Sequence, residues 1–249
     1  MRRVRSALLL GLACAGAATA QTSVEVAHGI ENLSNGSRDW RESVVTVRHA
    51  FGPTPRSPSL ALGLTRTERF GLSDDQVAIS GVTPLSADVT ASVDASRSTT
   101  HRILPESTLG AVLQYEFAKT WLLHGGARTT RYEEARINQG LLMLEHYTGP
   151  FSWAVGMRRA RAFDTSTSSG ELRGSYYYGD RHSIGVIVAA GREAANIGGV
   201  VTLTSQRSAV LVGRYWLRPN LALAYSLGHT REGDYYNRNG ASLGIQATF

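Results

Sequence analysis

The sequence predicts an all-β protein: a closed, antiparallel, up-and-down β-barrel that crosses a membrane with its strands. Three observations predict this fold class. Short runs of alternating apolar and polar residues recur along the chain, separated by clusters of Gly, Pro, Asn, Asp and Ser. Aromatic residues gather at the ends of these runs, where amphipathic rings settle at a membrane interface. The last run ends on an aromatic residue, Phe249, with no polar tail after it.

The final run, residues 239–249, shows the alternation most clearly. Every second residue from Asn239 onward is mostly apolar, and the interleaved residues are polar or small. A period of two places these sets on opposite faces of a β-strand. In water, such a final edge strand would invite aggregation. In lipid it is stable, provided that the sheet closes and leaves no backbone group unpaired.

The first twenty residues predict a secretory signal peptide. Three arginines within the first five residues precede an apolar run, and Ala18-Thr19-Ala20 supplies a small-residue cleavage site. The apolar run is shorter than the ~20 residues that a membrane-spanning helix needs. We therefore expect residues 1–20 to be a cleaved signal and residues 21–249 to form one barrel domain. The only cysteine, Cys14, lies in the signal, so we expect neither a disulfide nor a thiolate site in the barrel.

Charge and hydropathy exclude two other classes of protein. The net charge of +6 falls to +3 without the three arginines of the signal. The remaining arginines are scattered among the expected strands, whereas nucleic-acid binding would need them clustered on one face. No stretch near 18 consecutive apolar residues follows the signal, so we expect no helical membrane spans.

Fourteen runs fit strands, with twelve as the alternative because the runs near 76–83 and 136–147 alternate poorly. An even number is expected for a bacterial single-chain barrel. The expected strands lie near 22–32, 39–51, 58–69, 75–83, 86–97, 107–117, 120–132, 136–147, 151–162, 170–178, 182–193, 201–217, 220–231 and 236–249.

The connections between the runs predict the orientation of the barrel. Numbered from the N-terminus, the even connections are tight, as in AK, TGP and LRPN, whereas several odd ones are longer or more polar: TTHRILPE, DTSTSS, ANIGGVV and REGDYY. Outer-membrane barrels place short turns in the periplasm and longer loops outside. We therefore expect both termini in the periplasm.

The aromatic residues divide between the two ends and predict two interfacial girdles. A soluble β-sandwich, the alternative, would give no reason for aromatics to cluster at strand ends. Beside the even turns or at the C-terminus lie Phe51, Tyr115, Phe117, Trp121, Tyr147, Phe151, Trp153, Tyr176, Tyr178, Tyr215 and Phe249. Beside the odd loops lie Trp40, Phe70, Tyr132, Phe163 and Tyr235.

Charged residues occur on the faces opposite the apolar ones. In a soluble fold they would form a solvated exterior. In a closed barrel they must face inward, because a charge on the lipid side near the midplane costs about 2–4 kcal/mol. Both signs are present, which favours pairing across the lumen over a single-sign selectivity filter. The predicted lumen-lining residues are Glu25, Glu31, Asp88, Asp94, Glu116, Arg128, Arg158, Arg173, Glu193 and Arg238.

The C-terminal octet resembles the assembly signal of bacterial outer-membrane barrels, through Ser242, Gly244, Ala247 and Phe249. More narrowly, LSNGSRDWRE (33–42), YNRNG (236–240) and SLGIQATF (242–249) resemble the YaiO-type outer-membrane β-barrel family. This resemblance implies a location in the bacterial outer membrane and a barrel architecture. It supplies no established activity, so no catalytic residue carries over. The assembly signal implies the barrel-assembly machinery as a partner during biogenesis.

The residues favour a conduit over an enzyme. Barrels of eight strands are filled by side chains, and those of 16–18 leave a channel, so fourteen predicts a narrow lumen. We expect a conduit for small solutes or saccharides, or a structural envelope component. The alternative is an outer-membrane lipid-modifying enzyme, for which His229 with Ser226 is the candidate pair, although no G-x-S-x-G motif is present.

No histidine and carboxylate set has metal-ligand spacing, and no pattern indicates a cofactor. Outward arginines near the outer rim, such as Arg66, could meet phosphates. We therefore expect outer-membrane lipid and lipopolysaccharide as partners, together with a polysaccharide or small solute.

Overall fold

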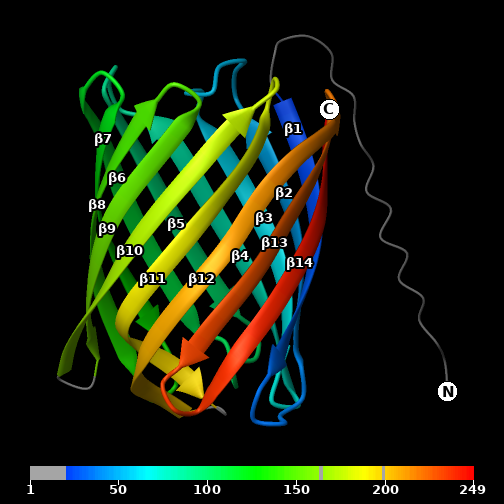
Figure 1. Cartoon of the computed structure of the whole chain (residues 1–249), viewed down its shortest axis with the longest axis vertical. Helices are drawn as coiled ribbons and strands as arrows, with labels where there is room; N and C mark the ends of the chain where they lie inside the picture. Colours follow the sequence, from blue (N-terminus) through cyan, green and yellow to red (C-terminus); the bar gives the residue numbers. More distant parts are fainter. Residues whose placement is uncertain (1–20, 163–164, 198–199) are drawn as a thin grey trace, which may run out of the picture.

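The structure, a computed structural model, describes residues 21–162, 165–197 and 200–249, with the backbone alone for residues 193–197 and 200–203. The described residues form fourteen strands in one closed antiparallel barrel, in which each strand pairs with its neighbours in sequence and β1 pairs with β14 (Figure 1). The strands are β1 (Gln21–Leu33), β2 (Trp40–Ala50), β3 (Ser59–Arg69), β4 (Leu72–Pro84), β5 (Val89–Ser98), β6 (Ser107–Ala118), β7 (Trp121–Arg131), β8 (Arg136–Thr148), β9 (Phe151–Ala162), β10 (Thr165–Tyr178), β11 (His182–Ile197), β12 (Val200–Arg218), β13 (Leu221–Glu232) and β14 (Tyr236–Thr248). The predicted fold class and the larger strand count are confirmed.

The final strand closes the barrel. β14 pairs with β1 from Ser23↔Thr248 to Leu33↔Arg238, without a break in register. The Phe249 N–H donates to the Thr22 carbonyl at 2.8 Å, which extends the pairing to the last residue. Because β14 also pairs with β13, neither of its backbone edges is left open. Closure of this kind satisfies the backbone groups that lipid cannot hydrogen-bond.

The alternation of side chains builds an apolar outer face. Leu60, Leu62 and Leu64 of β3 are exposed, and Leu64 lies opposite the exposed Val45 of β2. The interleaved residues of β3 are small or polar and point to the other side of the sheet. The same pattern recurs around the barrel, so exposed apolar side chains form a continuous belt on the outside.

Both termini of the barrel lie at one end, called here the turn end (top of Figure 1), and the opposite end is called the loop end. Most turn-end connections are tight, such as residues 119–120 between β6 and β7, and residues 219–220 between β12 and β13. Within the described residues, no helix has the length and hydropathy needed to cross a membrane.

Three strands are longer at the loop end than the sequence predicts. β10 begins at Thr165 rather than at 170, and β11 continues to Ile197 rather than to 193. Most of DTSTSS and ANIGGVV is therefore strand, because Thr, Val and Ile fit a paired strand well. β4 begins at Leu72 because Phe70 and Gly71 both have positive φ, of 53° and 78°. Two such residues form a type I′ hairpin turn, which pairs the flanking residues directly.

The aromatic girdle predicted at the turn end is present. Trp121 stacks on His146 with ring centroids 4.0 Å apart, and His182 stacks on Tyr215 at 4.4 Å. Phe151 and Tyr176, both exposed, stack at 5.0 Å. Histidines thus join the girdle as amphipathic rings. Tyr147 is an exception, because its position in the register sends it inward, where it stacks on Tyr177 at 6.3 Å.

The girdle predicted at the loop end is wrong for Trp40 and Phe70, whereas Tyr235 is exposed. Trp40 lies opposite Glu31 on the inward face and is 4% exposed. It packs inside the barrel mouth against Phe70 and Tyr236, with ring centroids 5.1 and 5.8 Å apart. The parity of strand β2 decides this placement, since Trp40 is an even number of residues from the other inward residues of β2. Phe163 lies outside the described residues.

The outer belt predicts how the barrel responds to a new charge. Ile79 of β4 is exposed on the outer face, whereas the next residue, Ser80, points inward and lies opposite Asp94. We expect Ile79→Arg to lower the free energy of unfolding by about 2–4 kcal/mol. We expect Ser80→Arg to lower it far less, because the new guanidinium can meet Asp94. Denaturant titration of the protein in lipid vesicles measures both. Equal losses would contradict an outward, lipid-facing Ile79.

Candidate functional site

The inner wall of the barrel carries charges of both signs. Eight of the residues predicted to line the lumen lie on the face opposite the apolar belt: Glu25, Glu31, Asp94, Glu116, Arg128, Arg158, Arg173 and Arg238. Asp88 does not, because β5 begins one residue later and leaves Asp88 exposed in the turn, where its carbonyl accepts the Glu116 N–H at 2.8 Å. The side chain of Glu193 lies outside the described part of the structure.

One ion pair crosses a whole strand near the middle of the wall. Arg128 of β7 donates from Nη2 to both carboxylate oxygens of Asp94 on β5, at 2.9 and 3.0 Å. The intervening strand β6 places Gly110 between them. A Cβ at Gly110 would lie 2.7 Å from Oδ1 of Asp94 and 3.2 Å from Nε of Arg128. The glycine therefore gives the two side chains room to meet.

Further charges form a triad beside this pair. Glu171 of β10 lies between Arg158, at 3.1 Å, and Arg173, at 2.5 Å. Its side chain is 9% exposed, so the carboxylate depends on the two guanidinium groups for compensation. The sequence prediction included both arginines but omitted Glu171. Its parity with Arg173, two residues away on the same face, was the signal that could have found it.

A second bridge spans the closing strands from inside. Nη2 of Arg214 on β12 lies 3.4 Å from Oε2 of Glu25 on β1, although β13 and β14 lie between them. The inward residues along this route, Ala224 and Gly244, are small and lie in register with Arg214. A Cβ at Gly244 would come within 3.0 Å of the Ala27 Cβ. Small residues again let a charged pair reach across neighbouring strands.

The other residues of the predicted assembly signal lie on both faces of β14. Ser242 points inward, as Gly244 does, and shares a hydrogen bond with Ser226 at 2.7 Å. Ala247 points outward, and Phe249 follows the strand and is 64% exposed. The terminal aromatic ring thus stays accessible after the barrel has closed.

At the loop end, the inner wall narrows around Trp40. The guanidinium carbons of Arg69 and Arg238 lie 4.5 and 4.7 Å from the Trp40 ring centroid, as cation–π pairs. Arg238 also lies 2.8 Å from Glu31 and 3.5 Å from Glu232. Arg69 lies 4.0 Å from Glu42. Each cation therefore contacts both the Trp40 ring and at least one carboxylate.

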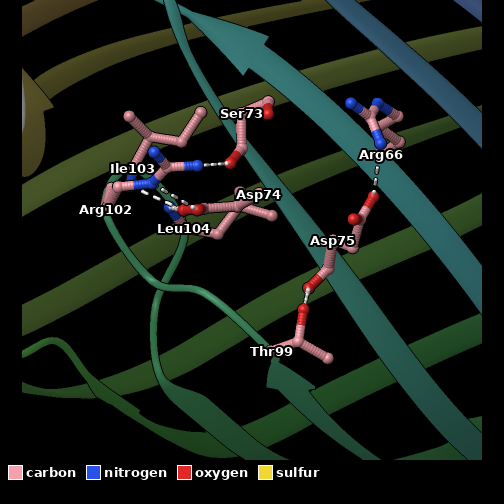
Figure 2. Close-up of polar contacts among 8 residues, drawn as sticks. All are labelled: Arg66, Ser73, Asp74, Asp75, Thr99, Arg102, Ile103 and Leu104. Carbon is pink, nitrogen blue, oxygen red and sulfur yellow. Dashed lines mark hydrogen bonds and ion pairs between the residues drawn. The ribbon is translucent and has the colours of Figure 1, made fainter. Parts of the chain in front are cut away.

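The connection between β5 and β6, residues 99–106, is tied to the inner face of β4 (Figure 2). Asp74 is 1% exposed, and its Oδ2 accepts the backbone N–H groups of Ile103 and Leu104, at 2.7 and 2.9 Å. Nε of Arg102 lies 3.6 Å from the other oxygen, and the same guanidinium donates to the Ser73 carbonyl. Because Asp74 points inward, opposite Thr67, this loop leans over the mouth.

A second connection, residues 132–135 between β7 and β8, also lies at the loop end. Burial raises the pKa of the Tyr132 phenol, and the positive charge of Arg69 opposes that rise. Tyr132 lies between β7 and β8, whereas Arg69 ends β3. Because the charge of Arg69 acts on the Tyr132 phenol, the residue 132–135 connection lies near Arg69.

The inner wall stays polar down to the turn end. Nε2 of His124 lies 2.9 Å from Glu145, and Ser152 shares a hydrogen bond with the Tyr177 hydroxyl at 3.2 Å. Arg56, from the connection between β2 and β3, lies 3.7 Å from Glu116 on β6. A polar solute would therefore meet hydrogen-bonding groups along the whole length.

Cavities lie between these contacts. One, of about 300 Å³, lies at the loop end and is lined by Trp40, Arg69 and Arg238 among others. Another, of about 330 Å³, lies beside Asp94, Arg128 and Arg158. The first has a mixed lining, which includes Ile30 and Val210 as well as the charged groups, and the second is more polar. Both suit water or small hydroxylated solutes.

The candidate catalytic pair is not assembled. His229 points outward, where its Nδ1 lies 2.7 Å from Asn239, whereas Ser226 points inward to Ser242. A period of two therefore puts the expected base and nucleophile on opposite sides of the sheet. Among the described residues, no group of three or more His, Cys, Asp and Glu is arranged to hold a metal ion.

Comparison with solved structures shows the same fold at low sequence identity. CymD, a monoaromatic hydrocarbon channel, is 11% identical with a TM-score of 0.61, covering 93% of this chain and 88% of CymD. Omp33 of Acinetobacter baumannii is 10% identical with a TM-score of 0.57, covering 92% and 99%. The KdgM porin in complex with disordered oligogalacturonate is 11% identical with a TM-score of 0.52, covering 91% and 99%.

Comparison by sequence is more specific. No curated protein matches the chain. The family model described as YaiO membrane beta barrel domain matches residues 21–196, which span β1 to nearly the end of β11.

The anchoring of residues 99–106 by Asp74 predicts a protease-sensitive variant. Asp74→Ala removes the acceptor of two N–H groups and one ion pair, each worth more than an ordinary neutral contact. We expect trypsin to cleave after Arg102 roughly tenfold faster or more, as followed by mass spectrometry of the folded barrel. Asp75→Ala is the control, because Asp75 points outward to Arg66 at 3.6 Å. Equal cleavage of the two variants would contradict the anchor.

Proposed function

Because the chain belongs to the YaiO membrane β-barrel family, we propose that this outer-membrane barrel, which resembles porins in fold, is a narrow conduit for small polar solutes, saccharides among them. The observation that carries the proposal is the inner wall, where pairs such as Asp94–Arg128 and Glu25–Arg214 line a closed barrel. We place the turn end in the periplasm, since outer-membrane barrels keep their short turns there. The signal peptide expected at residues 1–20 would deliver the chain for export.

The chemistry of the wall favours a hydroxylated solute over a hydrocarbon. CymD is a monoaromatic hydrocarbon channel, whereas the KdgM structure contains an oligogalacturonate. The inner wall here presents carboxylates, guanidinium groups and glutamines, and an apolar solute would displace water from these groups without replacing its hydrogen bonds. Sugar hydroxyls can donate hydrogen bonds to the carboxylates and accept them from the arginines.

The pairing of charges supports weak ionic selectivity. Glu171 pairs with both Arg158 and Arg173, and Asp94 pairs with Arg128, so these five groups carry only one net positive charge. Neither sign dominates the midsection, as a strongly selective filter would require. Neutral solutes therefore suit the lumen better than ions of one charge, and the loop-end constriction around Trp40 limits their size.

Two further roles belong to the proposal. Assembly into the membrane would use the C-terminal residues Ser242, Gly244, Ala247 and Phe249, which resemble the signal read by the barrel-assembly machinery. A purely structural contribution to the envelope is the role left if nothing passes through the lumen.

Planar-bilayer recording of the purified barrel tests the conduit. We expect small currents with weak selectivity. Arg158→Gln should raise the cation-to-anion permeability ratio because it removes one positive charge from the inner wall, while Arg173 still pairs with Glu171. Glu116→Gln should lower the ratio because it removes a negative charge. Arg159→Gln is the matched control, because the next residue along β9 points outward and should leave the ratio unchanged. No current above background, in the wild type or in the variants with Glu116 and Arg158 neutralised, would reject the conduit.

The enzyme alternative has its own test. His229 is the histidine on which a lipid-modifying reaction would depend, and it faces the membrane beside Asn239. We expect His229→Ala to leave the lipid A and phospholipid composition of the host membrane unchanged, as measured by mass spectrometry of extracted lipids. A change in acyl or phosphate content that wild-type protein restores would instead support the enzyme.

A further inference from the structure

The outer face of the barrel carries exposed arginines in the loop-end part of its strands. They share this face with the apolar belt, as Arg159 follows the exposed Val155 and Met157 along β9. Their positions in the register put all of them on the membrane-facing side. The residues are Arg41, Arg66, Arg97, Arg131, Arg136, Arg159, Arg161, Arg192, Arg207 and Arg231.

Several of these arginines face one another directly. Arg131 of β7 lies opposite Arg136 of β8. On its other side Arg131 lies opposite Ser107 of β6, which in turn lies opposite Arg97 of β5, so the three arginines form one row across the sheet. Arg207 of β12 lies opposite Arg231 of β13. Like charges at directly opposed positions in a sheet are destabilising. The repulsion within such pairs must therefore be offset by carboxylates of the chain or by anions bound from the surroundings.

Acids of the chain supply only part of that compensation. Arg131 lies 3.1 Å from Glu106, and Arg231 lies 3.3 Å from Asp234. Within the described residues, Arg97, Arg136 and Arg207 make no ion pair. Glu133 and Glu134 lie in the connection between Arg131 and Arg136, but no ion pair within the described residues ties them to these arginines. The guanidinium groups of Arg97 and Arg136 are thus left without a paired carboxylate on a surface where solvent screening is weaker than in open water.

An apolar hollow lies beside this row. It has a volume of about 690 Å³, and its wall includes Val93, Leu109 and Ala111. The next positions in the register are Ala127 and Gly140, where a Cβ on Gly140 would meet nothing within 4 Å. Arg159 lies directly opposite Gly140. Cationic groups therefore border an open apolar surface on the outside of the barrel.

We propose that this surface, formed by strands β5 to β9, binds lipid A of lipopolysaccharide. A lipid A phosphate lies between Arg131 and Arg136, within reach of Arg97, and an acyl chain occupies the hollow beside Gly140. Arginine suits the phosphate because its planar guanidinium donates two parallel hydrogen bonds. The hollow suits an acyl chain because its lining is apolar. This proposal rests on the loop end facing outward, and it holds whether or not solutes pass through the lumen.

Binding of purified lipid A to the full barrel in detergent, followed by native mass spectrometry, tests the phosphate contact. We expect Arg131→Gln/Arg136→Gln to weaken binding of bisphosphorylated lipid A roughly tenfold. Arg48→Gln/Arg218→Gln, which removes one lumen-facing arginine and one outward arginine at the turn end, should leave binding unchanged. The chemically dephosphorylated lipid should bind wild type and both variants with equal, weaker affinity.

A second pair of variants tests the hollow. Gly140→Leu should fill it and weaken lipid A binding severalfold while the barrel still folds, because the position is open. Gly174→Leu, at another outward glycine with nothing within 4 Å of its Cβ, should have no effect. Unchanged lipid A affinity in Arg131→Gln/Arg136→Gln would overturn the proposal. Equally tight binding of phosphatidylglycerol would overturn the assignment to lipid A.

Discussion

The structure depends on one constraint: in hydrocarbon, every backbone N–H and C=O group must be paired within the protein. The pairing of β1 with β14, continued by the hydrogen bond from Phe249 to Thr22, meets that constraint. Once the sheet is closed, each strand has only two directions for its side chains. Apolar side chains point toward the lipid, and polar and charged side chains point into the lumen.

This division explains why small residues matter on the inner wall. A barrel narrow enough for its charges to pair must let their side chains cross neighbouring strands. Gly110 makes this crossing possible for Asp94 and Arg128. Arg214 reaches Glu25 across the small residues Ala224 and Gly244, which lie in register with it. Glycine costs strand propensity, and here the cost is offset by ion pairs that hold strands together from within. Neither glycine has a positive φ, so side-chain space, rather than backbone conformation, is the reason for it.

Period-two patterns made the strands, the outer belt and the turn-end girdle predictable, because each depends on local sequence alone. Asp88 was misplaced because strand ends are uncertain by a residue, and one residue separates a lumen position from a turn. Trp40 was assigned to a girdle from its place beside a loop, although its parity at the start of β2 sends it inward. The anchoring of Ile103 and Leu104 by Asp74 joins residues about thirty positions apart in sequence. Alternation carries no information on such a contact.

The two faces of the sheet use the same residue type in different ways. Inside, Arg128, Arg158 and Arg238 each have a carboxylate of the chain within 3.1 Å. Outside, arginines face other arginines across the register, as Arg131 faces Arg136. A folded chain could relieve that repulsion with a single acidic substitution nearby, as Glu106 partly does for Arg131. Within the described residues, Arg97 and Arg136 make no ion pair, and they lie beside an apolar hollow. A surface complementary to an anionic lipid requires this arrangement. A conduit function of the lumen alone would require neither the unpaired outer arginines nor the hollow beside them.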